Sequence, residues 1–199
     1  MKKKLNYFMS AAVVVLLTSC GGAEESNENQ ENDVAEETGP TFEESCATDN
    51  DVFVQIEKYG HNFDSTFTYK DKIEIVRSEW SQKDDSTATL SLYNYDLGAA
   101  DTATNFKILV EFHSKNGQVL QAADYGYNDY DSDFWARVNI ISPLGTVWFN
   151  WSMGMPKQGY VKLNYLDKEN ACGEFTLEVD KPTSNTIGHV VLKGPFKTL

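Results

Sequence analysis

The sequence predicts an all-β protein in which a single antiparallel β-sandwich or barrel of about ten strands follows a disordered acidic tether. Three observations lead to this fold class. Apolar and polar residues alternate through much of the chain after Cys46, and turn-forming residues separate the alternating runs. No run of eleven or more residues shows a convincing 3.6-residue period, so we expect no long helix after the signal region.

Five runs place apolar side chains on one face of an extended chain at every second position. They cover residues 52–56, 106–112, 147–153, 161–165 and 175–179. In the second run Phe106, Ile108 and Val110 share one face, whereas Lys107 and Glu111 lie on the other. Alternation of this kind indicates strands with one buried face and one solvated face.

Turn signals separate these runs. Asn116-Gly117 predicts a type I′ hairpin, because both central residues of that turn need a positive φ. Ser142-Pro143-Leu144-Gly145 separates a second pair of strands, and residues 167–170 separate a third.

The N-terminus carries a targeting signal. Met1-Lys2-Lys3-Lys4 precedes an apolar run over residues 11–17, and Leu17-Thr18-Ser19-Cys20 follows. These four residues resemble the lipobox of bacterial lipoproteins. The resemblance implies that residues 1–19 are a signal peptide removed by cleavage and that Cys20 receives a diacylglyceryl group and further acylation, palmitate included. The alternative is a membrane-spanning helix, which needs about 20 apolar residues, more than this run provides.

The tether is predicted over residues 20–45. Between Gly21 and Glu57 there are twelve acidic residues and no Lys or Arg, whereas residues 58–199 carry a charge of only −4. A segment this polar cannot bury enough apolar surface to offset its ordering entropy. The acidity also argues against nucleic acid as a partner, because phosphate binding needs clustered Lys and Arg.

Ala23-Glu24-Glu25 is similar to the acidic cluster that follows the lipidated cysteine in surface-exposed lipoproteins of Bacteroidota. The resemblance implies a lipid-anchored protein of the outer membrane. Whether it faces the periplasm or the cell surface stays open, with the surface favoured.

The end of the chain resembles small β-rich lipoproteins of Bacteroidota, in which two strands each carry a G-x-F motif. Here these are Gly173-Glu174-Phe175 and Gly194-Pro195-Phe196. The resemblance supports the β-rich fold of residues 46–199 and implies no catalytic residue.

Cys46 and Cys172 are the two cysteines that remain once Cys20 is lipidated. In an oxidising compartment such a pair predicts a disulfide bond; the alternative is two separate buried thiols.

Residues 125–135 form an unusual aromatic and acidic segment. Its aromatic residues, together with one later tryptophan, are candidates for a platform that stacks against sugar rings: Tyr125, Tyr127, Tyr130, Trp135 and Trp148. The alternative is that they are core or cross-strand residues. Asp129, Asp131 and Asp133 have the spacing of the first three ligands of a calcium loop. The rest of that loop does not match, so a solvated acidic loop is the alternative.

No catalytic motif accompanies the three histidines His61, His113 and His189. We therefore expect a lipid-anchored envelope protein with a non-catalytic binding or scaffolding domain and no cofactor. Its partner would be another envelope protein or a glycan. The first alternative is a carbohydrate- or Ca²⁺-binding module that uses residues 125–135. The second is a hydrolase whose site is assembled from scattered residues.

Overall fold

A computed structural model gives the fold of this chain. It describes residues 39–57, 68–100, 102, 104–142, 145–148, 159–179 and 189–199, with the backbone alone at residues 142, 145–148 and 179. The signal peptide, Cys20, the acidic cluster after it and the tether as far as residue 38 lie outside these residues. The same holds for His61 and for residues 149–153 of the third predicted strand.

The predicted all-β class is confirmed: the regular secondary structure of the described residues is nearly all strand, with almost no helix. The strands are β1 (Asp51–Glu57), β2 (Thr68–Glu74), β3 (Arg77–Asp84), β4 (Thr87–Tyr93), β5 (Lys107–Ser114), β6 (Asp124–Tyr127), β7 (Phe134–Ser142), β8 (Gly145–Trp148), β9 (Tyr160–Leu166), β10 (Ala171–Val179) and β11 (Val190–Lys197). The described helical segments are a turn of α-helix, α1 (Phe42–Ser45), and a 3₁₀ turn, η1 (Lys115–Gly117).

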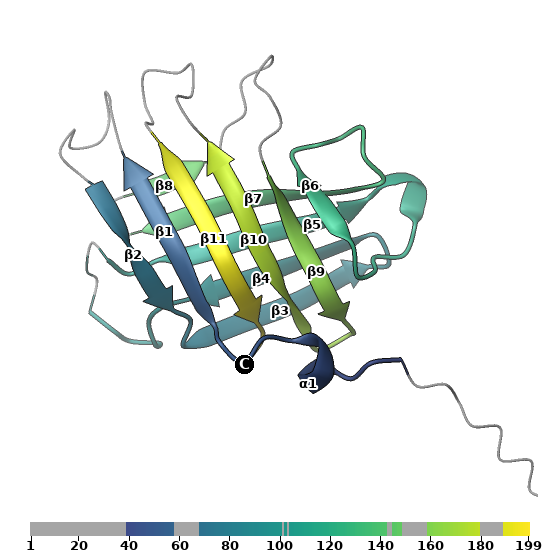
Figure 1. Ribbon diagram of the computed structural model, residues 1–199, viewed down its shortest axis with the longest axis horizontal. Helices are drawn as coiled ribbons and strands as arrows, with labels where there is room; N and C mark the ends of the chain where they lie inside the picture. Colours follow the sequence, from purple (N-terminus) through teal and green to yellow (C-terminus); the bar gives the residue numbers. More distant parts are fainter. Residues whose placement is uncertain are drawn as a thin grey trace, which may run out of the picture. The chain divides into compact units, whose positions relative to one another are not determined.

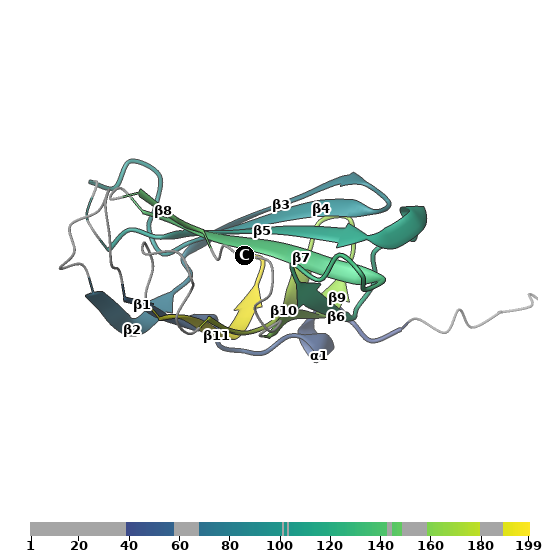
Figure 2. The same cartoon turned by 90° about the horizontal axis from the view of Figure 1, so that it is seen from above.

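One sheet contains all the described strands and curls into a half-barrel. Its order is β2-β1-β11-β10-β9-β6-β7-β5-β4-β3, and β8 pairs with the end of β7. The sheet folds over itself into two layers whose strands cross: β2, β1, β11, β10, β9 and β6 form one, and β3, β4, β5, β7 and β8 form the other (Figures 1 and 2). Curling brings two half-buried faces together, which is how alternating strands bury their apolar side chains.

Two corners connect the layers. At one, β6 and β7 make the single parallel pairing of the described sheet, and only two residue pairs are in register there. At the other, Ile75 and Val76 join β2 to β3. The amide of Ile75 donates to the carbonyl of Asn50, and that of Val76 donates to the carbonyl of Tyr93, so this short link is bonded to both layers.

The core lies between the layers and follows the predicted alternation. Phe106, Ile108, Val110 and Phe112 are fully buried, as are Val52, Val54 and Ile56. Aromatic side chains fill its centre, where Phe112 packs edge-on against Tyr125 with 5.0 Å between ring centroids.

The two G-x-F motifs lie opposite one another in the β10–β11 ladder. Gly173 pairs with Phe196, and Phe175 pairs with Gly194. Each phenylalanine therefore lies opposite a glycine, which has no side chain. The two phenyl rings pack against one another with their centroids 4.5 Å apart. A Cβ at Gly173 would meet the Phe196 ring at 2.9 Å and the carbonyl oxygen of Lys162 at 1.8 Å. The motif is thus a packing device of two adjacent strands.

The hairpin predicted at Asn116-Gly117 is wrong. Both residues have a positive φ, 57° and 71°, as the predicted turn requires. The chain does not return along β5, however, because β4 and β7 already pair with its two edges. The turns at residues 142–145 and 167–170 do connect antiparallel neighbours, β7 with β8 and β9 with β10.

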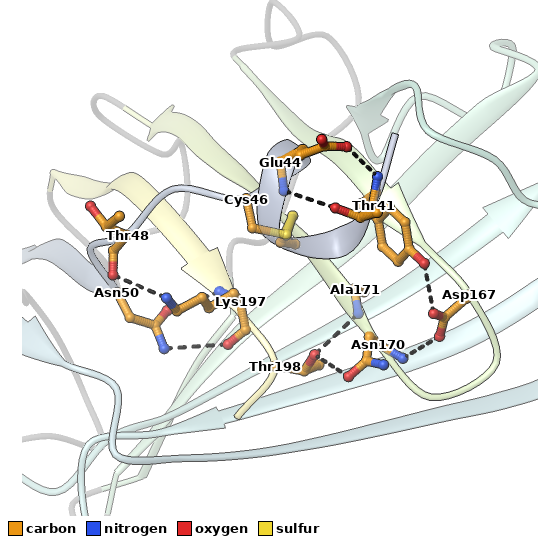
Figure 3. The surroundings of a disulfide bond; sticks show 12 residues. Thr41, Glu44, Cys46, Thr48, Asn50, Asp167, Asn170, Ala171, Lys197 and Thr198 are labelled. Atoms are coloured by element: carbon orange, nitrogen blue, oxygen red, sulfur yellow. Dashed lines mark hydrogen bonds between the residues drawn. A yellow bond between two sulfur atoms is a disulfide. The ribbon is translucent and has the colours of Figure 1, made fainter. Parts of the chain in front are cut away.

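The described part of the chain begins at Gly39, and α1 lies within the segment 20–45 for which a tether is predicted. Thr41 and Glu44 form a capping box: the Thr41 hydroxyl accepts from the Glu44 amide, and the Glu44 carboxylate accepts from the Thr41 amide (Figure 3). Phe42 packs edge-on against Tyr165 of β9. Sequence reasoning assigned these residues to the tether because their acidity resembles it, although the Thr-x-x-Glu spacing is a helix-start signal.

Candidate functional site

The loop between β6 and β7 forms the corner at which the sheet passes from one layer to the other. Two successive turns form it, closed by hydrogen bonds from the Asp129 amide to the Gly126 carbonyl and from the Ser132 amide to the Asp129 carbonyl, and Asn128 in the first turn has a φ of 48°. Lys115 ties the loop to the end of β5: its amide donates to the carbonyl of Asp133, and its ammonium donates to the carbonyl of Asp131. The loop therefore has a defined position on the sheet.

The aromatic residues of the predicted platform divide between two environments. Tyr125 and Tyr127 are buried in the core, so the prediction that they form part of an exposed platform is wrong. Alternation along β6 puts both on the same face, and that face is the inner one. The Tyr125 hydroxyl donates to the carbonyl of Gln121 at 2.9 Å and accepts from its amide at 3.2 Å. Burial raises the pKa of Tyr125 to about 12 and raises that of Tyr127 as well.

Tyr130 and Trp135 lie away from the core. The Tyr130 side chain is 47% exposed, and its ring meets the half-buried indole of Trp135 edge-on at 4.7 Å between centroids. Trp148 pairs with Asn139 in the β7–β8 register, but its side chain is outside the described part of the structure. Of the five predicted aromatic residues, the structure thus brings two together on the surface.

Three residues join Tyr130 and Trp135 that the sequence did not single out as ligand-binding. They come from the antiparallel pairing of β5 with β7, in which His113 lies opposite Trp135 and Glu111 opposite Arg137. The imidazole of His113 stacks on the indole at 3.9 Å, with 12° between the planes. We name these five residues the Trp135 cluster: Glu111, His113, Tyr130, Trp135 and Arg137.

Charge in the Trp135 cluster is carried by Arg137 and Glu111. The Arg137 guanidinium lies 5.4 Å from the Trp135 ring centroid and 5.8 Å from that of Tyr130, both within cation–π range. Its Nη1 is 3.9 Å from the nearer Glu111 carboxylate oxygen, too far for a hydrogen bond. The signal that could have revealed this arrangement is the set of polar residues opposite the apolar face of 106–112. The sequence does not show, however, that the strand carrying these polar residues pairs with β7.

The surroundings of His113 lower the pKa of its imidazole. Desolvation lowers the pKa of its imidazole, an effect that the nearby Glu111 carboxylate opposes. Its Nε2 is buried and has no hydrogen-bond partner among the described residues. Within the cluster, His113 therefore contacts Trp135 through the stacking of the two rings.

The three aspartates of the predicted calcium loop do not converge on a common point. Within the described residues, no group of three or more His, Cys, Asp or Glu side chains is arranged to hold a metal ion. Asp131 and Asp133 are exposed, and the backbone carbonyls of both accept from Lys115 instead. A lysine ammonium thus lies beside the loop that has the aspartate spacing of a calcium site.

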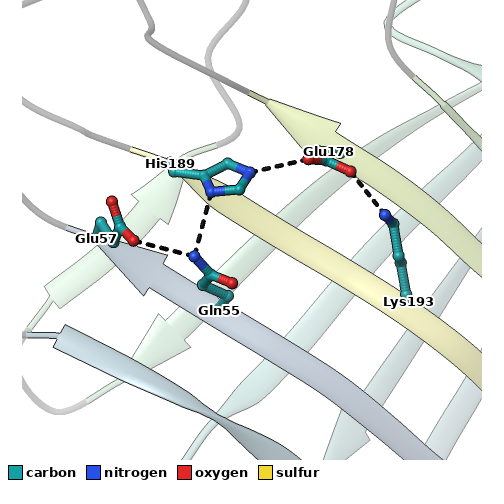
Figure 4. Close-up of polar contacts among 5 residues, drawn as sticks. All are labelled: Gln55, Glu57, Glu178, His189 and Lys193. Carbon is teal, nitrogen blue, oxygen red and sulfur yellow. Dashed lines mark hydrogen bonds and ion pairs between the residues drawn. The ribbon is translucent and has the colours of Figure 1, made fainter.

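A second polar cluster lies on the outer side of the other layer (Figure 4). The two ring nitrogens of His189 are both engaged: Nε2 is 3.0 Å from Glu178, and Nδ1 is 3.1 Å from the Gln55 amide nitrogen. Lys193 binds the other Glu178 oxygen at 2.6 Å. Hydrogen bonds from Lys193 and His189 lower the pKa of Glu178.

This arrangement differs from that of a catalytic base. The carboxylate of Glu178 accepts the Nε2 proton, and the Gln55 amide donates to Nδ1, so neither nitrogen is left to take a proton from a nucleophile. In the described part of the chain, neither His113 nor His189 hydrogen-bonds a Ser, Thr or Cys side chain.

The predicted disulfide is confirmed: Cys46 and Cys172 are bonded, with their Cα atoms 5.7 Å apart. It links the residue after α1 to β10 (Figure 3). Around it, Asn50 and Lys197 exchange two hydrogen bonds, and Asp167 accepts from the Asn170 amide and the Tyr165 hydroxyl. The start of the domain is therefore joined both covalently and by hydrogen bonds to its last strands.

Comparison with protein-family models, with curated proteins and with solved structures finds no match to this chain. A search of the described residues for membrane-spanning helices finds none of sufficient length and apolarity.

Proposed function

We propose that this chain is a lipid-anchored protein of the bacterial outer membrane, attached through Cys20 after removal of residues 1–19. An acidic tether links the anchor to a β domain that binds or scaffolds a partner without catalysis. The lipobox resemblance of Leu17-Thr18-Ser19-Cys20 supports the anchor, and the resemblance of Ala23-Glu24-Glu25 to a surface-export signal supports display on the outer face.

The observation that carries this proposal is the disulfide between Cys46 and Cys172. Such bonds persist in the periplasm and at the cell surface and are rare in the reducing cytoplasm. The position of the disulfide also suits a domain that is tethered through its N-terminal segment. It joins the beginning of the folded unit to β10, which is flanked by β9 and β11, so a pull on the N-terminal segment is shared with the interior of the sheet.

The absence of catalysis is proposed on the state of the described histidines. His189 has both nitrogens engaged, and the Nε2 of His113 is buried away from any substrate. A general base needs a free nitrogen within hydrogen-bond reach of the proton that it removes.

Metabolic labelling with an alkyne analogue of palmitate tests the anchor. The full chain expressed in a bacterial host should incorporate the label and partition into the detergent phase, and Cys20→Ala should abolish both. Cys46→Ala is the matched control, since it removes a cysteine of the β domain and should leave labelling unchanged. A labelled Cys20→Ala chain, or an unlabelled wild-type chain, would refute the anchor. Protease treatment of intact cells then distinguishes the surface from the periplasmic face.

A further inference from the structure

We propose that the Trp135 cluster binds the pyranose ring of a glycan. The inference deepens the proposed function, because it names the ligand class for a domain that we take to be a binding module. The ligand would stack on Tyr130, which Trp135 contacts edge-on, and would hydrogen-bond to Arg137 and Glu111.

The stacking surface would be the exposed part of the Tyr130 ring. A pyranose presents one face of C–H groups, which packs on an exposed aromatic ring while its hydroxyls remain available at the edge. Tyr130, at 47%, is the more exposed of the two exposed tyrosines of the described structure, and Trp135 contacts its ring edge-on. An exposed ring that is held in place loses little conformational entropy when a ligand stacks on it.

The support of this ring is built in advance. His113 stacks on the Trp135 indole, and the cross-strand pairing of β5 with β7 keeps the two rings in contact. The corner loop that carries Tyr130 is bonded to Lys115. The geometry of the site thus does not depend on a ligand to form.

The polar groups of the Trp135 cluster suit sugar hydroxyls. The side chains of Arg137 and Glu111 are 51% and 38% exposed, and the distance of 3.9 Å between them leaves each with unused hydrogen-bonding capacity. Arg137 supplies a planar set of donors and Glu111 a pair of acceptors. Adjacent hydroxyls of a hexopyranose act as both donor and acceptor, so the pair matches them.

The sheet beside the cluster leaves room for more than one sugar. In the β4–β5 register Thr87 lies opposite His113, and Thr89 lies opposite Glu111. Both threonine side chains are small and carry a hydroxyl group, and both lie on the outer face of β4. An oligosaccharide could therefore lie across β7, β5 and β4, its next residue meeting a floor of hydroxyl groups.

A second aromatic cluster on the same outer face, around Tyr93, is covered by neighbouring side chains. Tyr93 is buried beneath its neighbours: the Arg77 guanidinium lies 3.5 Å from its ring centroid, and its hydroxyl donates to Glu79. No ring face is left there for a ligand. The contrast with Tyr130 singles out the Trp135 cluster.

A protein partner fits this face less well. The core of a stable protein interface is depleted in charge and buries about 800 Å² on each side. Apart from His113, the positions beside Trp135 on β7, β5 and β4 are charged or small and hydroxylated. Aromatic stacking bordered by polar groups is the pattern of a sugar site.

The test uses the full-length protein purified in detergent and an array of oligosaccharides built from hexopyranoses and N-acetylhexosamines. Chitohexaose, maltohexaose and mannan serve as soluble probes for titration. We expect one glycan class to bind. Tyr130→Ala and Arg137→Ala should each weaken that binding at least tenfold, which corresponds to about 1.4 kcal/mol.

Tyr160→Ala is the matched control. Tyr160 is a similarly exposed tyrosine, at 38%, on β9 of the other layer, and its removal should leave the dissociation constant unchanged. Unchanged melting temperatures in the three variants show that the fold is intact.

Three results would overturn the proposal: an array without binding, binding that Tyr130→Ala leaves unchanged, or a photo-crosslinker at position 130 that captures a protein in place of a glycan. The Cys20→Ala chain should bind the same glycan as the wild type. Failure of the lipid anchor and failure of the sugar site are therefore separate outcomes.

Discussion

Gly173 offers the sharpest test of how the β10–β11 motif works. In Gly173→Ala the new Cβ would lie 1.8 Å from the carbonyl oxygen of Lys162 and 2.9 Å from the ring of Phe196. Neither contact can be relieved by rotating a flexible side chain, because one partner is backbone and the other is a ring packed against Phe175. Strands β9 and β10 must therefore separate at the bulge between Cys172 and Gly173.

The loss in the free energy of unfolding follows from the contacts that are broken at this bulge. Separation removes one or two ladder hydrogen bonds, each worth about 1 kcal/mol, and leaves buried polar groups partly unsatisfied. Displacing the two phenyl rings adds about 1–3 kcal/mol of packing strain. The smaller chain entropy of unfolded alanine returns about 0.5–1 kcal/mol. We expect a net loss of about 2–4 kcal/mol in the free energy of unfolding, or about 5–15 °C in melting temperature for a domain of this size.

Urea denaturation of the oxidised full-length protein, followed by tryptophan fluorescence, measures this change. Gly39→Ala is the control, because a Cβ at Gly39 meets nothing within 4 Å, and its stability should change by less than about 0.5 kcal/mol. A Gly173→Ala midpoint equal to that of the wild type would refute the reasoning. So would an equal loss in Gly39→Ala.

Three further predictions concern the disulfide, a histidine and a buried hydroxyl. Replacing Cys46 and Cys172 together by Ala opens a link of 126 residues in sequence and should cost about 5 kcal/mol on the chain-entropy model; a loss below about 1 kcal/mol in urea would contradict it. The pKa of His113 is lowered by folding, so the unfolded chain takes up its proton first as pH falls. Stability should therefore decline as the pH falls below the ordinary histidine pKa of 6.5. Melting temperatures measured between about pH 8 and pH 5.5 should fall less steeply in His113→Gln than in the wild type. An unchanged slope would rule out His113 as a source of the decline. Tyr125→Phe removes both hydrogen bonds to Gln121 and should lower the free energy of unfolding by about 1 kcal/mol in urea; a more stable variant would show that these bonds do not stabilise the fold.

Strand faces were predicted best where one face is strongly apolar. The residues of 106–112 alternate as expected, because each buried side chain lies two positions from the next and polar residues separate them. In β6 the same rule puts Tyr125 and Tyr127 on one face, but it does not say that this face is the inner one. A four-residue strand with tyrosine on one face and Asp and Gly on the other carries too little contrast to decide this.

The hairpin at Asn116-Gly117 shows a different kind of failure. The local conformation was predicted correctly, since both residues have a positive φ. The partner of β5 was not, because the segment after the turn competes with β7 for the same edge. β7 pairs with β5 over eight residues, which outweighs what the four-residue β6 could supply.

Residue types and their order were enough to determine the all-β class, the two turns that connect neighbouring strands and the pairing of Cys46 with Cys172. Each depends on local side-chain periodicity, on backbone preferences of single residues or on there being only two candidate cysteines in the domain. The tertiary structure alone decided which strands are neighbours: the parallel corner of β6 and β7, the opposed G-x-F motifs and the stack of His113 on Trp135. These contacts join residues far apart in the chain. They form because the curled sheet as a whole buries its apolar faces, and no single segment encodes that outcome.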